Sequence, residues 1–262
     1  MTKAPIILLG YQRSGTTALA HVLQQAVAQE GGLFTNNGKL LYYLHRWLTP
    51  EDVDARHFRF DEIQHALRRV HPYGQEQKTT EWLERADTAL ADAAEAIWRN
   101  TLPPRAHLEI AKRIVTAAYA RWPIWGEKYN ECMLDIAYLE AVLERPRYVF
   151  VFRNPVAVSF SMMNWCQGKR WNPMTRKEAI EKWVRWNTLT IDGLARVDPK
   201  RILYVEYSPD LLSSAFRKKL GAFTELSLDE LCFAKFSPTA PSEEPNRGRS
   251  KQLLRQLREL TE

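Results

Sequence analysis

The stretch that decides the fold is P-I-I-L-L-G-Y-Q-R-S-G-T-T-A-L, residues 5–19. Four apolar residues, Ile6 to Leu9, predict a short buried strand, and Gly10 predicts a turn after it. Apolar residues at helical spacing from Leu19 onward predict a helix that begins at Thr16. The first amides of a helix have no partner within it and lie at the positive end of the helix dipole. This order of elements therefore predicts a phosphate-binding loop.

The predicted loop differs from the loop of nucleoside triphosphatases. Gly10 and Gly15 have the spacing of the Walker A pattern, but Thr16 and Thr17 follow where that pattern has Lys and then Ser or Thr. The missing lysine is the group that reaches the β- and γ-phosphates of a triphosphate. Arg13 supplies a positive charge within the loop instead. The loop therefore predicts a ligand whose anionic group is shorter than a triphosphate.

A second stretch predicts another anion-binding position. Y-V-F-V-F, residues 148–152, predicts a buried strand that ends at Arg153. Asn154 is a good N-cap and Pro155 suits the first helical position, so we expect a helix directly after the strand. Arg153 would then lie at the carboxyl edge of the sheet, where α/β sheets bind ligands and where a guanidinium can pair with phosphate.

Together the two stretches resemble the cofactor motifs of sulfotransferases that use 3′-phosphoadenosine 5′-phosphosulfate (PAPS). In that family an Arg at the end of a strand and a Ser eight residues later bind the 3′-phosphate, and here these are Arg153 and Ser161. The resemblance assigns the 5′-phosphosulfate to Arg13, Ser14, Gly15, Thr16 and Thr17.

The resemblance extends to further positions. Lys128 matches a Lys at the end of a strand, and with Arg13 it would stabilise charge that grows on the sulfuryl and leaving-phosphate oxygens. Tyr207 matches an aromatic residue that lies near the adenosine. In the family, a short basic segment of the C-terminal loop binds the 3′-phosphate. Its loose counterpart here is Arg247, Gly248 and Arg249.

The catalytic base is not assigned by the resemblance. Where some members carry a Glu base, this chain has Asn36 and Asn37, and where others carry a His, it has Asn130. An amide side chain does not act as a base. The remaining candidates for the base are Glu127, Glu109, His45 and His71.

The resemblance implies a soluble, bacterial-type small-molecule sulfotransferase. Its reaction would move the sulfuryl group from PAPS to a hydroxyl or amine of a small-molecule acceptor, such as a natural product, without a metal. The products would be the sulfated acceptor and 3′-phosphoadenosine 5′-phosphate. Because the base is unassigned, a non-catalytic nucleotide-binding module stays open as an alternative. A P-loop-like nucleotide kinase is a further alternative, against which the missing lysine argues.

The fold implied is α/β: a P-loop-like parallel sheet flanked by helices, in one sulfotransferase-like domain over residues 1–262. Helix-forming sequence over residues 50–122 predicts a helical insertion that forms a lid over the acceptor site, with helices that include residues 80–83 and 89–98. A helix is also expected over residues 132–143, and a loop over residues 162–165. The Pro- and Ser-rich residues 237–251 predict a mobile C-terminal loop.

Composition limits the partners and the compartment. Lys and Arg number 37 against 31 Asp and Glu, a net charge of +6 that fits an anionic ligand. The basic residues are interspersed with acidic ones, so a nucleic-acid partner is not expected. No stretch approaches 18 apolar residues, and the cysteines Cys132, Cys166 and Cys232 are widely spaced. We therefore expect a cytoplasmic protein without a membrane partner, and a homodimer stays open.

Overall fold

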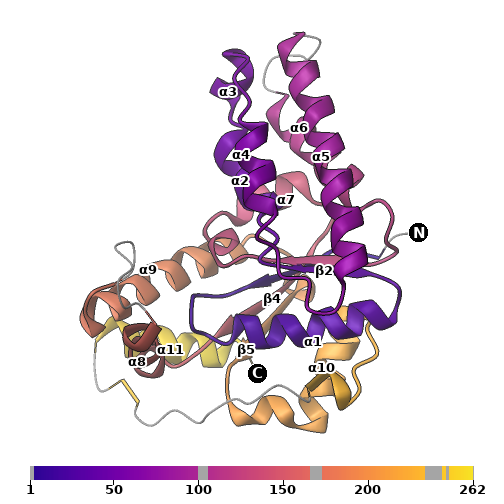
Figure 1. Cartoon of the computed structure of the whole chain (residues 1–262). Coiled ribbons are helices and arrows are strands. Elements are labelled where there is room, and N and C mark those ends of the chain that lie inside the picture. The colour runs from indigo at the N-terminus through magenta and orange to yellow at the C-terminus, as the bar shows by residue number, and fades with distance from the viewer. Residues whose placement is uncertain (1–2, 100–105, 166–172, 234–243, 246–247, 262) are drawn as a thin grey trace.

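A computed structural model describes residues 3–99, 106–165, 173–233, 244–245 and 248–261, and over these residues it contains a five-stranded sheet with helices on both faces (Figure 1). All the strand pairs are parallel, and the order β2-β3-β1-β4-β5 puts β1 at the centre. The strands are β1 (Ile6–Leu9), β2 (Leu33–Asn36), β3 (Trp125–Lys128), β4 (Arg147–Phe152) and β5 (Ile202–Glu206). This arrangement confirms the predicted parallel α/β architecture.

Helices connect the strands and cover both faces of the sheet. They are α1 (Thr16–Gln29), α2 (Leu40–Trp47), α3 (Pro50–Asp54), α4 (Phe60–Leu67), α5 (Glu76–Trp98), α6 (His107–Tyr119), α7 (Ile136–Val142), α8 (Pro155–Trp165), α9 (Arg176–Leu194), α10 (Ser214–Thr224) and α11 (Arg249–Glu259). A short 3-10 helix, η1 (Asn130–Leu134), follows β3.

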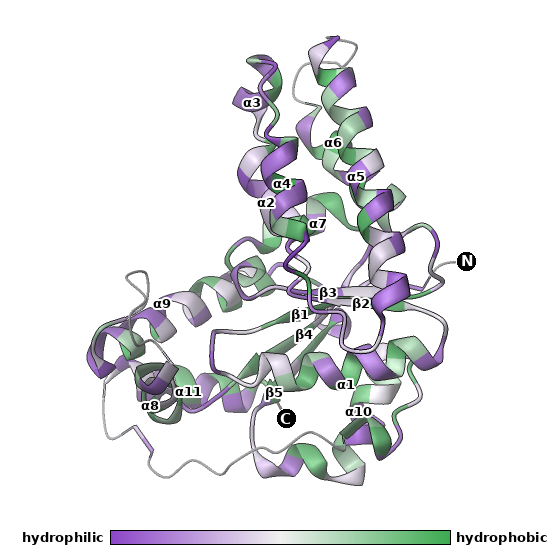
Figure 2. Ribbon diagram, in the orientation of Figure 1, coloured by the Kyte–Doolittle hydropathy of each residue, from purple (hydrophilic) through white to green (hydrophobic). Residues whose placement is uncertain are grey.

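The core lies on both faces of the sheet because successive strand residues point to opposite faces. Ile6 and Leu8 of β1 pack with α1, whereas Ile7 and Leu9 pack with the helices of the other face. All four residues of β1 and residues 149–152 of β4 are accordingly hydrophobic (Figure 2). A sheet buried on both faces is typical of parallel strands joined by helical crossovers.

Most of the described chain between β2 and β3 is helical. It contains α2 to α6, and Figure 1 shows α2–α4 and α5–α6 rising from the sheet as two columns. Trp82 and Leu90 of α5 and Ile110 and Ile114 of α6 are buried between the helices of this region. The first of these helices, α2, begins four residues after the carboxyl end of β2 and therefore stands beside the ligand-binding edge of the sheet.

Three local expectations differ in detail from the structure. Residues 80–83 and 89–98 belong to the single helix α5, because no Gly or Pro interrupts the chain between them. Residues 162–165 continue α8, with Met162 fully buried against the core. The helix expected over residues 132–143 is divided into η1 and α7, because Asp135 turns the chain and its Oδ1 accepts the amide hydrogen of Tyr138 at 3.0 Å.

Candidate functional site

The loop between β1 and α1 leaves hydrogen-bonding groups open at the start of a helix. Gly15 is the N-cap of α1 in the left-handed conformation (φ +88°), and among the described residues no side chain caps this helix start. Ser14 is fully buried, and its Oγ has no hydrogen-bond partner in the described part of the chain. Thr16 is buried and Thr17 is exposed in the first turn. Unpaired donors at a helix N-terminus suit an anion.

Tyr207 lies directly against this loop. A Cβ atom on Gly15 would lie 1.9 Å from the ring carbon Cδ2 of Tyr207, so the ring covers the glycine. Tyr207 directly follows β5, and its backbone amide donates to the carbonyl of Phe152 at 2.7 Å. The sheet therefore holds this aromatic ring at the loop.

The two sequence motifs meet in one cluster. Arg13 Nε donates to Ser161 Oγ at 2.9 Å, although the two residues are 148 positions apart. Arg153 Nη1 donates to the carbonyl of Arg13 at 3.4 Å, and the Arg153 guanidinium lies 5.2 Å from the centre of the Tyr207 ring. Asn154 Oδ1 accepts the amide hydrogen of Val156 at 2.9 Å, which confirms the predicted N-cap at the start of α8.

Lys128 and Asn130 follow the neighbouring strand. Lys128 is the last residue of β3 and is only 6% exposed, and burial lowers the pKa of its ammonium to about 8. Asn130 Nδ2 donates to the carbonyl of Gly10 at 2.7 Å and to Thr16 Oγ1 at 3.1 Å. Asn130 is therefore part of the phosphate loop's support, a role that the sequence analysis missed because it depends on a contact 120 residues away in the chain.

A sequence profile of the sulfotransferase family matches residues 5–214. The chain belongs to the sulfotransferase family. The match contains the loop after β1, Lys128, and the Arg153–Ser161 segment.

Solved structures of other sulfotransferases share the fold of this family member. The sulfotransferase domain from the curacin biosynthetic pathway is 13% identical with a TM-score of 0.58, and the match covers 98% of this chain and 99% of that one. The sulfotransferase domain of the Synechococcus PCC 7002 olefin synthase is 19% identical (TM-score 0.57; 98% and 88% covered). A Mycobacterium tuberculosis sulfotransferase is 13% identical (TM-score 0.52; 100% and 77% covered). A search of curated proteins found no significant match.

Three of the four base candidates have partners away from Arg13, Arg153 and Ser161, or are exposed far from them. Glu127 is 1% exposed and points to the α2 side of the sheet, where it accepts from Tyr119 Oη at 2.9 Å and from the amide of Leu41 at 3.3 Å. Burial raises the pKa of Glu127 to about 7. His45 Nε2 pairs with Asp135 Oδ2 at 2.8 Å. Glu109 is exposed on α6, about 15 Å along the helix from Tyr119 at 1.5 Å per residue.

The fourth candidate, His71, lies beside the end of β2. Its backbone amide donates to the carbonyl of Asn36 at 2.9 Å, and Asn36 is paired in the sheet with Lys128. Burial and the positive charges of Lys128 and Lys39 lower the pKa of His71. The residue as a whole is exposed.

Sequence analysis missed a carboxylate that is closer to the phosphate loop. Glu131 is half-buried in η1, and Gln12 Nε2 of the loop donates to its Oε1 at 3.3 Å. Burial raises the pKa of Glu131, and the positive charges of Lys128 and Lys182 oppose that rise. The sequence analysis could have considered Glu131 as a base candidate, because it is a carboxylate only three residues after Lys128 at the end of the strand.

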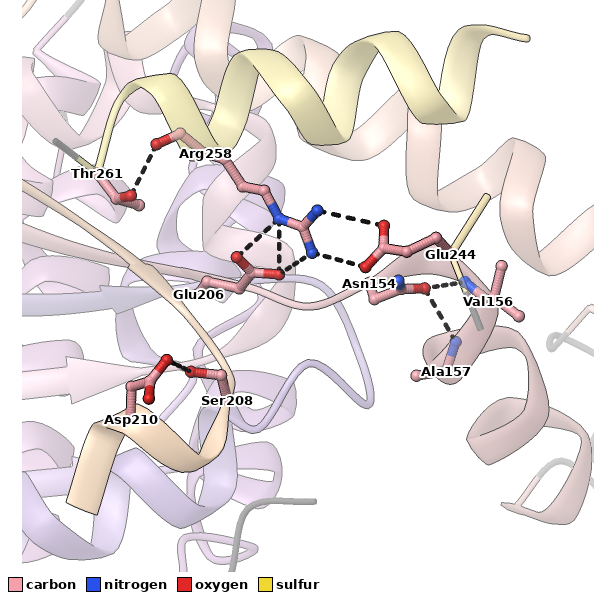
Figure 3. Close-up of polar contacts among 9 residues, drawn as sticks. All are labelled: Asn154, Val156, Ala157, Glu206, Ser208, Asp210, Glu244, Arg258 and Thr261. Atoms are coloured by element: carbon pink, nitrogen blue, oxygen red, sulfur yellow. Dashed lines mark hydrogen bonds and ion pairs between the residues drawn. The ribbon is translucent and has the colours of Figure 1, made fainter. Parts of the chain in front are cut away.

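The C-terminal helix is attached to the same edge of the sheet. Arg258 of α11 donates to both carboxylate oxygens of Glu206, the last residue of β5, at 2.7–3.1 Å, and also to Glu244 (Figure 3). Gly248 and Arg249 are exposed at the start of α11. Arg247 lies outside the described residues, as does most of the segment 237–251.

Two further properties of the described residues bear on the site. None of their helices combines the length and the apolar character that a membrane span needs. Within the same residues, no group of three or more His, Cys, Asp or Glu side chains is placed to hold a metal ion.

Proposed function

We propose that this protein transfers the sulfuryl group of PAPS to a hydroxyl or amine of a small-molecule acceptor. The observation that carries the proposal is the hydrogen bond between Arg13 and Ser161. It joins the motif that resembles a 5′-phosphosulfate loop to the motif that resembles a 3′-phosphate site. One nucleotide with phosphates at both ends would contact both motifs.

The residues of the cluster fit the parts of this nucleotide. The open amides of α1, with the buried Ser14 hydroxyl and Thr16, would hold the 5′-phosphosulfate. Arg153 and Ser161 would hold the 3′-phosphate, and the Tyr207 ring would contact the adenosine. When bound, PAPS supplies a sulfuryl group that is activated by its bond to phosphate.

Arg13 and Lys128 would stabilise the charge that develops during the transfer. The leaving phosphate gains negative charge as its bond to sulfur breaks, and preorganised cations stabilise that charge in a site with little water. Lys128 is suited to this role because it is buried at the end of β3. Strand β3 pairs in parallel with β1, so its end lies beside the loop that follows β1. Loss of one such donor typically lowers the rate by about 10²–10³.

This role predicts how binding depends on pH. Because the pKa of Lys128 is lowered to about 8, the free protein loses this charge as the pH rises through about 8. The affinity for 3′-phosphoadenosine 5′-phosphate should therefore fall above that pH. In Lys128→Arg the guanidinium stays charged, so this fall should be absent. Calorimetric titrations over pH 7–9 would measure it, and an affinity of the wild type that is constant across this range would contradict the role of Lys128.

The reaction itself is tested by following 3′-phosphoadenosine 5′-phosphate release from PAPS in the presence of pooled phenols, alcohols and amines. Acceptor-dependent release would support the transferase. Tight nucleotide binding without any transfer would favour the non-catalytic binding module instead. Tighter binding of ATP with Mg²⁺ than of PAPS would favour the kinase alternative.

We further propose that the protein acts in the cytoplasm, on a small-molecule acceptor and without nucleic acid or membrane. The interspersed charges support this proposal, as do the free and buried thiols of Cys132 and Cys232. The helices α2 to α6 would form the acceptor-site lid. Tyr42 of α2 supports that role, because its ring lies 5.0 Å from the ring of Tyr129 beside the end of β3.

A further inference from the structure

We propose that Glu131 is the general base that removes the proton from the acceptor hydroxyl. The inference rests on the proposed sulfuryl transfer and names a residue of the same site. Glu131 belongs to η1, directly after β3, and β3 is the neighbour of β1 in the sheet. Its Oε1 accepts from Gln12, which lies next to Arg13 in the phosphate loop. The carboxylate therefore lies beside the loop that would hold the sulfuryl group.

Glu131 differs from the other carboxylate near the end of β3. Both oxygens of Glu127 are held, one by Tyr119 Oη and one by the amide of Leu41, and that side chain is 1% exposed. The Glu131 carboxylate accepts from Gln12 and from the Tyr129 side chain, and it differs from Glu127 in that its side chain keeps partial access to solvent. An acceptor that enters beside η1 would meet Glu131 and not Glu127.

Tyrosine side chains lie close to Glu131: Tyr129 hydrogen-bonds to its carboxylate, and the charge of the carboxylate acts on Tyr43. The ring of Tyr129 lies 5.0 Å from that of Tyr42, and Tyr42 lies 5.0 Å from Tyr43. Tyrosine rings beside the carboxylate suit an aromatic acceptor, so phenols are appropriate probes of the base.

Lysines from three elements keep the carboxylate usable as a base. The charges of Lys39, Lys128 and Lys182 interact with it from the start of α2, the end of β3 and α9. Burial raises the pKa of Glu131 above its ordinary value, which brings a carboxylate closer to the working pH that a general base needs. The titratable groups that act on this carboxylate or are acted on by it are Lys39, Tyr43, Lys128, Tyr129, Cys132 and Lys182.

The proposed step balances without another reactant. The acceptor oxygen forms a bond to sulfur while the bond from sulfur to the 5′-phosphate oxygen breaks, and that oxygen keeps the electron pair. The acceptor proton passes to a Glu131 carboxylate oxygen and then to water. The products are the sulfate ester and 3′-phosphoadenosine 5′-phosphate.

The test compares the wild type with Glu131→Gln on phenols of graded acidity, with PAPS as donor. A general base contributes about 10²–10⁴-fold, so kcat/KM should fall by that factor for the least acidic phenol. The loss should shrink toward none for a phenol that is already ionised at the assay pH. The acidic limb of the wild-type pH profile should disappear in Glu131→Gln, while affinity for 3′-phosphoadenosine 5′-phosphate stays within about threefold, which is less than 1 kcal/mol.

Two further variants separate a base from a counter-ion of Lys128. Glu131→Asp keeps a carboxylate and should keep part of the rate together with the acidic limb. Glu144→Gln is the matched control, because Glu144 is exposed between α7 and β4, at the amino end of the sheet. An equal loss across all phenols in Glu131→Gln, or an acidic limb that persists, would overturn the inference. A wild type that binds no 3′-phosphoadenosine 5′-phosphate would overturn the proposed function as well.

Discussion

Position 15 of the phosphate loop is the position that accepts the fewest residue types, because both its backbone and its surroundings require glycine. Its φ of +88° lies in the region that L-residues rarely adopt, and the Tyr207 ring occupies the place of a Cβ. Both constraints arise from the turn that aims the start of α1 at the ligand. Glycine at this position therefore allows both the left-handed backbone conformation and the close approach of the Tyr207 ring.

Gly15→Ala should combine these two effects. The left-handed backbone costs an alanine about 1–2 kcal/mol, and a clash in a packed region adds about 1–3 kcal/mol. Gly31→Ala is the control, because its φ is +75° but no atom of the described residues would lie within 4 Å of the new Cβ. Urea unfolding of both variants should give a larger loss for Gly15→Ala, together with weaker nucleotide binding. Equal losses would mean that Tyr207 moves aside without cost.

The titration of the buried Glu127 carboxyl makes the free energy of unfolding depend on pH. Because burial raises its pKa from 4.5 to about 7, the folded state holds this proton more tightly than the unfolded chain does. Its contribution to stability is therefore complete below about pH 4.5 and is lost as the pH rises through about 7. The change amounts to roughly 3 kcal/mol.

Glu127→Gln should remove this dependence, since the amide keeps the shape of the protonated carboxyl and its oxygen can accept from Leu41. The free energy of unfolding of the wild type, relative to Glu127→Gln, should fall by up to about 3 kcal/mol between pH 4.5 and 8. Denaturant titrations at several pH values measure this difference. A difference that does not vary with pH would show that Glu127 keeps an ordinary pKa.

At the scale of elements, the site depends on the contact between α11 and the end of β5. Arg258 pairs with both oxygens of Glu206, and Glu206 immediately precedes Tyr207 (Figure 3). The same guanidinium binds Glu244, so one side chain of the last helix joins two segments. Such bidentate charged pairs fix geometry as well as supplying energy.

Arg258→Ala should therefore lower the free energy of unfolding by about 1–3 kcal/mol and weaken the binding of the adenosine part through Tyr207. Arg255→Ala on the same helix is the matched control. Arg255 makes an exposed pair with Glu259 one turn later, which is worth about 0.3–0.5 kcal/mol. Thermal unfolding and nucleotide titration of both variants would measure the contrast. Similar small effects in the two variants would contradict an anchoring role for Arg258.

At the scale of the whole molecule, local sequence patterns predicted the elements whose formation depends on neighbouring residues. The strand and loop around Gly10 and the N-cap Asn154 follow from neighbouring residues, whereas the position of Lys128 at the end of a strand followed from the resemblance. The parallel α/β class followed from the resemblance, and the sheet confirms it.

Other features depend on contacts between distant segments and could not be predicted this way. Asn130 supports Gly10 across 120 residues, and Arg258 meets Glu206 across 52. The half-buried position of Glu131 follows from the packing of η1 against the loop, which no local pattern specifies. The assignment of the base therefore required the structure.

The central claim is that Arg13, Ser161 and Arg153 belong to one site for a nucleotide with a 3′-phosphate. Its most direct test is a calorimetric comparison of 3′-phosphoadenosine 5′-phosphate with AMP, using the wild type and Arg153→Ala. A charged hydrogen bond contributes about 1.5–3 kcal/mol, so the wild type should bind the 3′-phosphorylated nucleotide about 10–100-fold more tightly than AMP. Arg153→Ala should lose most of this preference. Equal affinities of the wild type for the two nucleotides would contradict the claim.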